Sequence, residues 1–473
     1  MKTFSNYIWL GVLLLFAASC SKWIDVKPKT QVEAGEFFKN QLGFQEGLNG
    51  VYLQMNDRSL YGREMTFGLA DALGGQYVLG ITTNVAYQDA QKGIYDGYMR
   101  TLTDSIWGRS YTAIANLNKL ITAIDMADSA IFSGNNYRVI KGEAYGLRAF
   151  LHFDLLRWFG KSYAVGQGKD TAIVYKKLFN TQIPPRESVA STIANVLADL
   201  GVAEEALKAD IAYTGAMTAD RRLRFNYYAV KALQARVYLW ADDNTNALKA
   251  AEEVIAAQGK FPWVTSSAIS IGNDLQKDRV FTTEHIFGLF TNDMNRNTES
   301  LLDTSKFTNQ LTIDANRVAE QFETSSGGNV DWRNIYLIRN VATGTGPKLF
   351  FGKLYQPSGY TVALAKRMPL IRIPEMYYIA AEALIATNPG KAIGYLNTVR
   401  KNRGLATELS ATLTADQIHN EIRKEYRKEF PLEGQVYFYY KRRNATTIPG
   451  ATGTFSAARY LPLLPLRELE YGR

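Results

Sequence analysis

Two short helical hairpins in this chain share one spacing of small residues. In the first, Ala235 lies twelve positions before Ala247; in the second, Ala380 lies twelve positions before Ala392. This spacing is typical of tetratricopeptide repeats, in which two helix backbones approach closely and leave room only for small side chains. We therefore expect a mostly α-helical fold with tetratricopeptide-like hairpins as its scaffold. Unrelated helical hairpins are the alternative that periodicity alone leaves open.

Apolar residues recur at three- and four-residue steps along much of the chain, as in helices with one buried face. Residues 107–128 and 138–159 would form a third, longer helical pair, whereas residues 56–104 are rich in Gly and Thr and predict loops. The predicted helices lie at about 36–55, 107–128, 137–158, 188–209, 226–241, 244–257, 374–387, 389–403 and 415–430.

Residues 260–365 have a different character, because Asn, Thr, Gly and aromatic residues replace Ala and Leu. No helical period is maintained there, and short strands are expected only near 347–355. Long irregular segments inside a compact protein usually carry function. We therefore expect a single large domain in which a loop-rich, ligand-side insertion at about 260–365 separates an N-terminal helical part (about 36–260) from a C-terminal one (about 366–473).

Residues 1–19 have the pattern of a bacterial lipoprotein signal peptide. A positively charged start precedes an apolar stretch from Ile8 to Ala18 that is too short to span a membrane. Small residues then lead to Cys20, the only cysteine in the sequence. We expect cleavage before Cys20 and its acylation, so that a mature chain of 20–473 is lipid-anchored. An ordinary signal peptide with an incidental cysteine is the alternative.

Composition and motifs argue against several other classes of function. The net charge is +9, but it is spread along the chain with no run of five like charges, so a nucleic-acid partner is not expected. One cysteine excludes a thiolate zinc site, and His152, His285 and His419 are too far apart in sequence for a typical ligand pair. We therefore expect no metal, no cofactor and packed or surface histidines.

No nucleophile or metalloprotease motif is present, so we expect a protein that is not an enzyme. Glu425, Glu429 and Glu433 recur at four-residue steps and could be read as a catalytic carboxylate row. Basic residues surround them, however, so the pattern predicts a salt-bridged face at the helix surface.

Several segments then resemble the SusD/RagB family of nutrient-binding outer-membrane lipoproteins from Bacteroidetes. They agree with the family in order and spacing over nearly the whole mature chain. They include Leu48-Asn49-Gly50-Val51-Tyr52, Arg148-Ala149-Phe150, Arg372-Ile373-Pro374-Glu375, Leu396-Asn397-Thr398-Val399-Arg400 and Glu433-Gly434. The sequence departs from the family at Tyr426, Val436 and Tyr439, where members usually carry Arg, Arg and Asp. Since both partners of a charge pair are replaced together, no unpaired buried charge is expected.

The resemblance implies a non-catalytic protein at the outer membrane that faces the cell exterior. It would capture a nutrient and deliver it to a TonB-dependent barrel of the SusC type, with the helical hairpins facing the barrel and the loops facing the ligand. An oligosaccharide is the expected ligand, and a peptide is the alternative within the same role. A repeat scaffold that binds no small ligand is the alternative from another class.

A sugar ligand would need aromatic faces for its C–H surfaces and planar polar side chains for its hydroxyls. Two loop regions offer such side chains, and family members bind ligands in comparable loops. The candidate ligand-binding residues are Asp71, Tyr77, Asn84 and Tyr87 in the first region, and Asn292, Asn295, Arg296, Trp332, Arg333 and Tyr336 in the second. Trp107, Trp158 and Trp263 are expected to pack in the interior instead.

Overall fold

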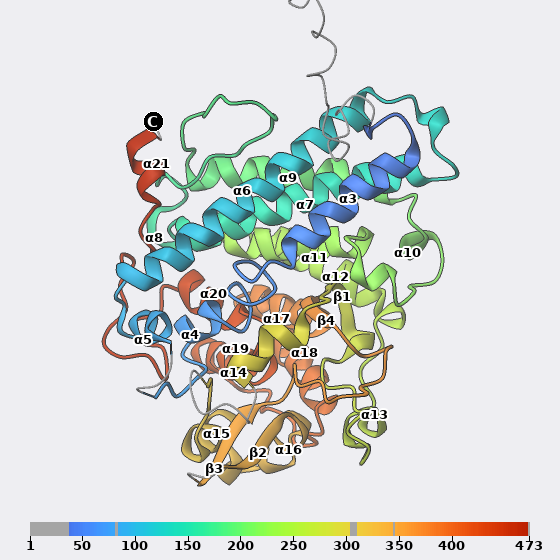
Figure 1. Ribbon diagram of the computed structural model, residues 1–473. Helices are drawn as coiled ribbons and strands as arrows, with labels where there is room; N and C mark the ends of the chain where they lie inside the picture. Colours follow the sequence, from blue (N-terminus) through green and yellow to red (C-terminus); the bar gives the residue numbers. More distant parts are fainter. Residues whose placement is uncertain (1–36, 81–83, 303–309, 344–345, 472–473) are drawn as a thin grey trace, which may run out of the picture.

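A computed structural model describes residues 37–80, 84–302, 310–343 and 346–471 of the chain. The predicted signal peptide and the lipid-anchoring Cys20 lie outside the described residues. Long helices occupy one end of the molecule, and short helices with two small sheets occupy the other (Figure 1).

The first helical layer contains the longest helices. Its members are α3 (Gln41–Met55), α6 (Gly97–Met126), α7 (Asn136–Phe159), α9 (Val189–Leu207), α11 (Tyr227–Trp240) and α12 (Asn244–Ala256). Helix α7 packs along α9 and against α6. A Cβ atom at Gly146 would lie 2.4 Å from the ring of Phe225, so only glycine permits this approach. Trp158 and Trp107 are buried in this layer, as predicted.

The second helical layer confirms the hairpin interpretation. Helix α17 (Ile373–Leu384) packs against α18 (Pro389–Lys401) within one hairpin, and it also packs against α12 of the other. All four alanines of the twelve-residue spacing are fully buried. Helices α19 (Ala415–Glu429) and α20 (Gln435–Arg442) complete the layer. The mostly α-helical, single-domain fold expected from the sequence is therefore confirmed.

The segment at 260–365 is less irregular than its composition predicts. It contains the short helices α13 (Ser266–Ser270), α14 (Met294–Leu302), α15 (Ala315–Phe322) and α16 (Trp332–Leu337), and the strands β1 (His285–Phe290), β2 (Ile338–Thr343) and β3 (Gly346–Phe351). Strands β2 and β3 form an antiparallel hairpin, which confirms the expected strand near 347. Strand β1 pairs antiparallel with β4 (Arg367–Arg372), which leads directly into α17 and so fastens this segment to the scaffold.

Residues 56–104 were expected to be loops, and this expectation is wrong in part. Helices α4 (Leu69–Leu73) and α5 (Val85–Lys92) lie there, and α6 begins at Gly97. Every residue of α4 is buried, so its contacts with the rest of the fold, rather than its own propensity, stabilise it. The remaining short helices are α8 (Tyr163–Gly166), α10 (Ile211–Thr214) and α21 (Leu466–Tyr471).

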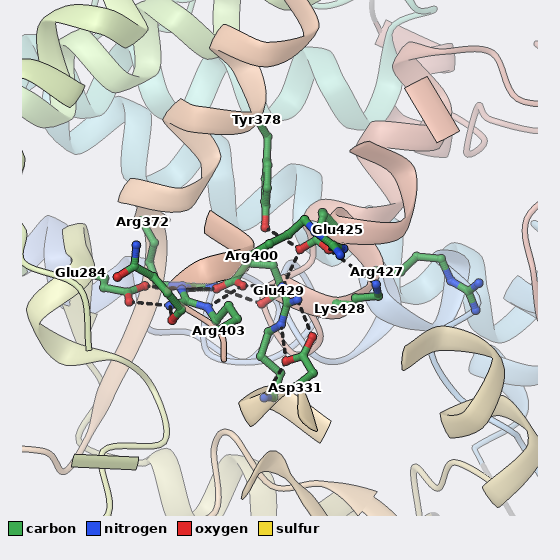
Figure 2. A network of polar contacts seen from close by, with 12 residues as sticks. Glu284, Asp331, Arg372, Tyr378, Arg400, Arg403, Glu425, Arg427, Lys428 and Glu429 are labelled. Atoms are coloured by element: carbon green, nitrogen blue, oxygen red, sulfur yellow. Dashed lines mark hydrogen bonds and ion pairs between the residues drawn. The ribbon is translucent and has the colours of Figure 1, made fainter. Parts of the chain in front are cut away.

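The carboxylate row at the end of α19 and just beyond it lies in the interior, not at the surface as predicted. Glu425, Glu429 and Glu433 are at most 2% exposed. Figure 2 shows Glu429 near the centre of a network of ion pairs, in which Arg372 and Arg403 each donate to one of its oxygens at 2.6 and 2.8 Å. Burial alone would raise the pKa of Glu429, but the neighbouring guanidinium groups hold it well below its ordinary value.

The same network joins the 260–365 segment to the helical scaffold. Arg333 of α16 donates to Glu425 and Glu429 of α19 at 2.9 Å each, and Arg403 reaches Glu284 at 2.7 Å. Although burial opposes ionisation, the positive charge of Arg333 and its neighbours lowers the pKa of Glu425 to about 2. Glu425 and Glu429 are therefore ionised, and all three carboxylates of the row accept hydrogen bonds from arginine or lysine, which suits a structural role.

The departure from the family pattern at α20 is compensated by packing. Val436 and Tyr439 are buried, and the rings of Tyr439 and Tyr426 lie 4.7 Å apart between centroids. The Tyr439 hydroxyl donates to the carbonyl of His419 at 3.3 Å. An aromatic pair thus occupies the place where relatives are expected to carry charges.

Candidate functional site

Three distant chain segments lie side by side at the end of the molecule that carries β2 and β3. The amide of Val78 donates to the carbonyl of Thr312 at 2.8 Å, and the amide of Ile313 donates to the carbonyl of Leu349 on β3 at 2.9 Å. The amide of Leu311 also donates to the carbonyl of Leu301, so the end of α14 adjoins the same place. These bonds build a small platform that no single segment could form alone.

A pocket of about 510 Å³ lies over this platform. We call it the platform pocket. Its apolar floor comes from Val78, Ile313 and Leu349, and its polar rim from Gln310, Thr312, Asp314, Asn340 and Lys348. The volume is within the range of ordinary small-ligand sites.

The polar rim of the platform pocket is ordered by local hydrogen bonds. The ammonium of Lys348 donates to the side-chain oxygen of Gln310 at 3.0 Å, and the Thr312 hydroxyl donates to the carbonyl of Val78 at 2.9 Å. Asp314 caps the start of α15 by accepting from the amide of Arg317. Amide, hydroxyl, ammonium and carboxylate groups together can bind a neutral, strongly hydrogen-bonding ligand.

Four of the predicted ligand-binding residues are interior side chains instead. Asp71, Tyr77, Tyr87 and Arg333 are each at most 1% exposed. Asp71 accepts hydrogen bonds from the amides of Leu432 and Gly434, and burial raises its pKa to about 8. These side chains offer no surface on which a sugar ring could stack.

The two phenolic side chains of the first region tie loops together. The Tyr77 hydroxyl donates to the carbonyl of Phe67 at 2.6 Å, and the Tyr87 hydroxyl donates to the buried carboxylate of Glu64 at 2.9 Å. Burial raises the pKa of both hydroxyls well above the ordinary tyrosine value, so they remain donors at physiological pH. Their role in the structure is to hold the segment around α4 and α5.

The remaining residues of the first region and of α14 are accessible. Asn84 is exposed and caps α5 through its side-chain oxygen, while Asn292, Asn295 and Arg296 are exposed around the start of α14. Arg58 donates to the carbonyl of Arg296 at 2.6 Å, and its neighbour along the loop, Glu64, binds Tyr87. Residues 58–64 therefore contact both the α5 side and α14.

Trp332 and Tyr336 of α16 lie apart from the platform pocket lining. Both pack, partly buried, on a second small core of Val264, Ile269, Phe281 and Leu337. The backbone of Gly404 lies directly against the Trp332 ring, where a Cβ atom would come within 2.3 Å of the indole nitrogen. This packing fixes the ring in place and leaves it only partly accessible to a ligand.

The platform pocket was not identified from the sequence. Its rim residues are spread over more than 30 positions and meet only through long-range pairing between β3 and the 310–313 segment. The sequence indicated a strand near 347–355, but not its partner. Trp263 packs on Tyr377 at 5.3 Å between ring centroids, as predicted.

Within the described ranges, no group of His, Cys, Asp and Glu side chains is arranged to hold a metal ion. In the same part of the chain, none of the helices combines the length and hydropathy needed to cross a bilayer.

Comparison with known proteins places this fold in a family. Residues 286–456 match the model of the SusD family, and residues 22–239 match a model described as "Starch-binding associating with outer membrane". SusD-like protein P2 of Formosa agariphila is 26% identical over 260 residues, which cover 53% of this chain and 46% of that protein. The match therefore spans less than half the length of that relative.

Solved structures match the fold along nearly the whole chain. A SusD superfamily protein from Bacteroides thetaiotaomicron has a TM-score of 0.73 at 22% identity, covering 92% of this chain and 98% of its own. A SusD-like carbohydrate binding protein from Bacteroides vulgatus has a TM-score of 0.73 at 19% identity, covering 91% and 96%. These structures agree with the fold. Because the two family models together match residues 22–239 and 286–456, which is most of the sequence, the protein belongs to the SusD/RagB family.

Proposed function

We propose that this protein is a non-catalytic binding protein of the outer membrane that captures an oligosaccharide in the platform pocket. After removal of residues 1–19, the mature chain would be anchored through acylated Cys20 and face the cell exterior. It would pass its ligand to a TonB-dependent barrel of the SusC type. The family model's description, "Starch-binding associating with outer membrane", supports this role, and the structural neighbour from Bacteroides vulgatus is itself named as carbohydrate binding.

The observation that carries the proposal is the platform pocket and its position. It is an open pocket with an apolar floor and a polar rim, formed by the loops and short strands expected on the ligand side. Asn292, Asn295 and Arg296 would extend the binding surface along α14, because the end of that helix adjoins the platform at Leu311. Asn84 would contribute from α5.

The absence of paired catalytic groups in the platform pocket supports binding without turnover. Asp314 is the only carboxylate among its described lining residues, whereas glycoside hydrolysis ordinarily uses two. The buried carboxylates Glu425 and Glu429 of α19 are paired with arginines in the interior and do not line the platform pocket.

A peptide is the second candidate ligand, and one observation favours it. The described residues that line the platform pocket include no aromatic ring, although sugar faces usually stack on such rings. The amide and charged groups on the rim would instead form hydrogen bonds with the backbone and the side chains of a peptide ligand.

Titration of the non-lipidated Cys20→Ser chain with panels of oligosaccharides and peptides tests the proposal, beginning with malto-oligosaccharides. We expect binding to an oligosaccharide that weakens about tenfold in Asn340→Ala, as for loss of a well-placed polar contact. Lys249→Ala on the exposed face of α12 is the matched control and should bind normally. Chromatography of the bound sugar completes the test, because the appearance of hydrolysis products contradicts a non-catalytic role.

A further inference from the structure

A small cavity lies where the two helical layers meet. Its volume is about 30 Å³, and side chains of α7, α11, α17, α19 and α20 line it. The described lining residues are all buried except Arg442, which is half-buried. A space of this size holds one or two particles as small as a water molecule, so it is too small for a sugar or a peptide.

Two buried donors in the wall of this cavity have no acceptor. The Nη1 atom of Arg236 and the indole nitrogen of Trp240 are inaccessible to solvent, and neither donates a hydrogen bond within the described part of the chain. Both residues line the cavity, and because they are four positions apart on α11 they lie on one face of that helix. An unsatisfied buried donor costs free energy, and the cost is greater when the donor is charged.

The acceptors around the cavity are already engaged. Through Nε and Nη2, the Arg236 guanidinium donates to the two carboxylate oxygens of Glu375 at 2.7 and 2.6 Å. Arg157 donates through Nη1 to the side-chain oxygen of Gln435 at 2.9 Å. Among the described lining residues, no buried acceptor atom lacks a partner. The group that the cavity lacks is therefore an acceptor that can reach the two free donors.

The charge of the lining favours a negatively charged acceptor. The described lining contains three guanidinium groups and a single carboxylate, namely Arg157, Arg236, Arg442 and Glu375. The carboxylates that pair with Arg157 and Arg442 are those of Asp154 and Glu382, which are not among the described lining residues. Burial lowers the pKa of Arg157, Asp154 opposes the shift, and the positive charge of Arg236 adds to it. A negative charge in the cavity would offset the repulsion between these two guanidinium groups.

We propose that this cavity, which we call the arginine cavity, binds a halide ion, with chloride as the natural occupant, between the guanidinium of Arg236 and the indole N–H of Trp240. A halide accepts hydrogen bonds and has no hydrogen of its own to place, whereas a water molecule must also donate two. The ion would connect α11 of the first helical layer to α19 and α20 of the second. The arginine cavity shares no described lining residue with the platform pocket, so the failure of either proposal leaves the other intact.

Thermal unfolding of the Cys20→Ser chain tests the proposal, with sodium chloride exchanged stepwise for sodium gluconate. Gluconate is too large for the arginine cavity, and a constant ionic strength keeps the screening of surface charges constant. We expect the unfolding midpoint to rise by about 1–3 °C and then level off, as for one ligand that binds only the folded chain. A midpoint that does not change, or that changes linearly without levelling off, overturns the inference.

A pair of tryptophan variants makes the test specific. Trp240→Phe removes the indole N–H from the arginine cavity and keeps an aromatic ring, so the chloride response should fall by at least about half. Trp158→Phe is the matched control, because within the described residues the Trp158 indole nitrogen is also buried without an acceptor, yet Trp158 does not line this cavity. Its chloride response should equal that of the wild type. Equal responses in the two variants overturn the inference, whatever their absolute midpoints.

A crystal structure of the Cys20→Ser chain in bromide gives a readout that does not depend on stability. Anomalous scattering should show one bromide ion within hydrogen-bond distance of Arg236 Nη1 and Trp240 Nε1. A water molecule at that position, without anomalous signal, overturns the inference. A bromide ion without any chloride response in solution is an adventitious ion only and does the same. If Trp240→Phe does not fold, the wild-type titration and this crystal structure still decide the question.

Discussion

The guanidinium of Arg333 donates to the carboxylate of Glu429 at 2.9 Å, although 96 positions separate the two residues in the chain. Arg333 belongs to the short helix α16, at the end of the molecule that carries β2 and β3, and Glu429 to α19 of the helical scaffold. Asp331 completes the surroundings of the guanidinium at 2.6 Å. A fully buried and fully paired arginine therefore connects the two parts of the molecule.

Loss of this arginine should be strongly destabilising. Arg333→Met leaves three buried carboxylates with fewer partners, and breaking a buried ion pair from one side costs about 3–5 kcal/mol. Urea unfolding of the Cys20→Ser chain measures the effect. Arg138→Met is the control, because Arg138 is exposed and donates only to the carbonyl of Glu205. Equal unfolding midpoints for the two variants would show that the network contributes little.

Acid should weaken the fold through His152. Its Nε2 accepts from the amide of Lys176 at 3.0 Å, so its proton lies on Nδ1 and is donated to the carbonyl of Arg148. Burial lowers the pKa of His152 to about 3, so the unfolded chain binds a proton below pH about 6.5 and the folded chain does not. The stability that this neutral histidine contributes is complete above that pH and is lost as pH falls.

The contribution of His152 to the pH dependence of stability is measurable with a variant that has no titrating group at position 152. Between pH 7 and pH 5 the free energy of unfolding of the wild type should fall by about 2 kcal/mol more than that of His152→Gln. The difference accumulates at roughly 1.4 kcal/mol per pH unit below 6.5. Unfolding midpoints at several pH values check this. His419→Gln, at a half-buried site where burial also lowers the pKa, should change the slope less. Parallel curves for the wild type and His152→Gln would contradict the prediction.

A single methyl group should be enough to disturb the packing of α7. Gly146→Ala places a Cβ atom 2.4 Å from the Phe225 ring, which is itself held by Phe150 and Phe287. We expect the free energy of unfolding to fall by about 1–3 kcal/mol, because the steric clash outweighs the gain in helix propensity. Gly394→Ala on α18 meets no atom within 4 Å and should be neutral or stabilising by up to about 1 kcal/mol. Thermal unfolding of both variants distinguishes the two environments.

Substitutions in the platform pocket should change ligand affinity, whereas substitutions of the interior tyrosines should change stability. Lys348→Ala should weaken ligand binding about tenfold with an unchanged unfolding midpoint, because Lys348 lies on the pocket rim. Tyr87→Phe should lower the free energy of unfolding by about 1–3 kcal/mol, since the buried carboxylate of Glu64 loses a donor, and leave affinity unchanged. Calorimetric titration and urea unfolding of both variants measure the two quantities. If Tyr87→Phe lowered the affinity without lowering the free energy of unfolding, Tyr87 would belong to the binding site.

The helical scaffold could be predicted from the sequence because helical periodicity and the spacing of small residues depend on residues that are close together in the chain. Periodicity and the buried alanines at 235, 247, 380 and 392 identified the hairpins, and helix ends such as Phe159 lay within a few residues of prediction. Residue type alone could not separate surface from interior elsewhere. Tyr87 and Glu429 are polar residues in segments read as exposed, yet each is buried with partners that are distant in sequence.

The platform pocket depended on pairing that no local pattern encodes. Val78 and Thr312 are joined by hydrogen bonds although 234 positions separate them. Asn340 and Lys348 are neighbours within the β2–β3 hairpin, but Gln310 and Thr312 join them only after β3 has paired with the 310–313 segment. Amphipathic periodicity describes one element and its buried face, whereas a pocket of this kind depends on the relative placement of several elements.

That construction bears on how such a protein can change over evolutionary time. The walls of the platform pocket meet through a few backbone hydrogen bonds between Val78, Thr312, Ile313 and Leu349, and they take no part in the packing of α7 on α9 or of α12 on α17. Insertions and substitutions in one wall can therefore alter the shape and polarity of the pocket while the hairpin scaffold keeps its geometry. The binding pocket of such a protein can thus diversify over evolutionary time without a change of fold.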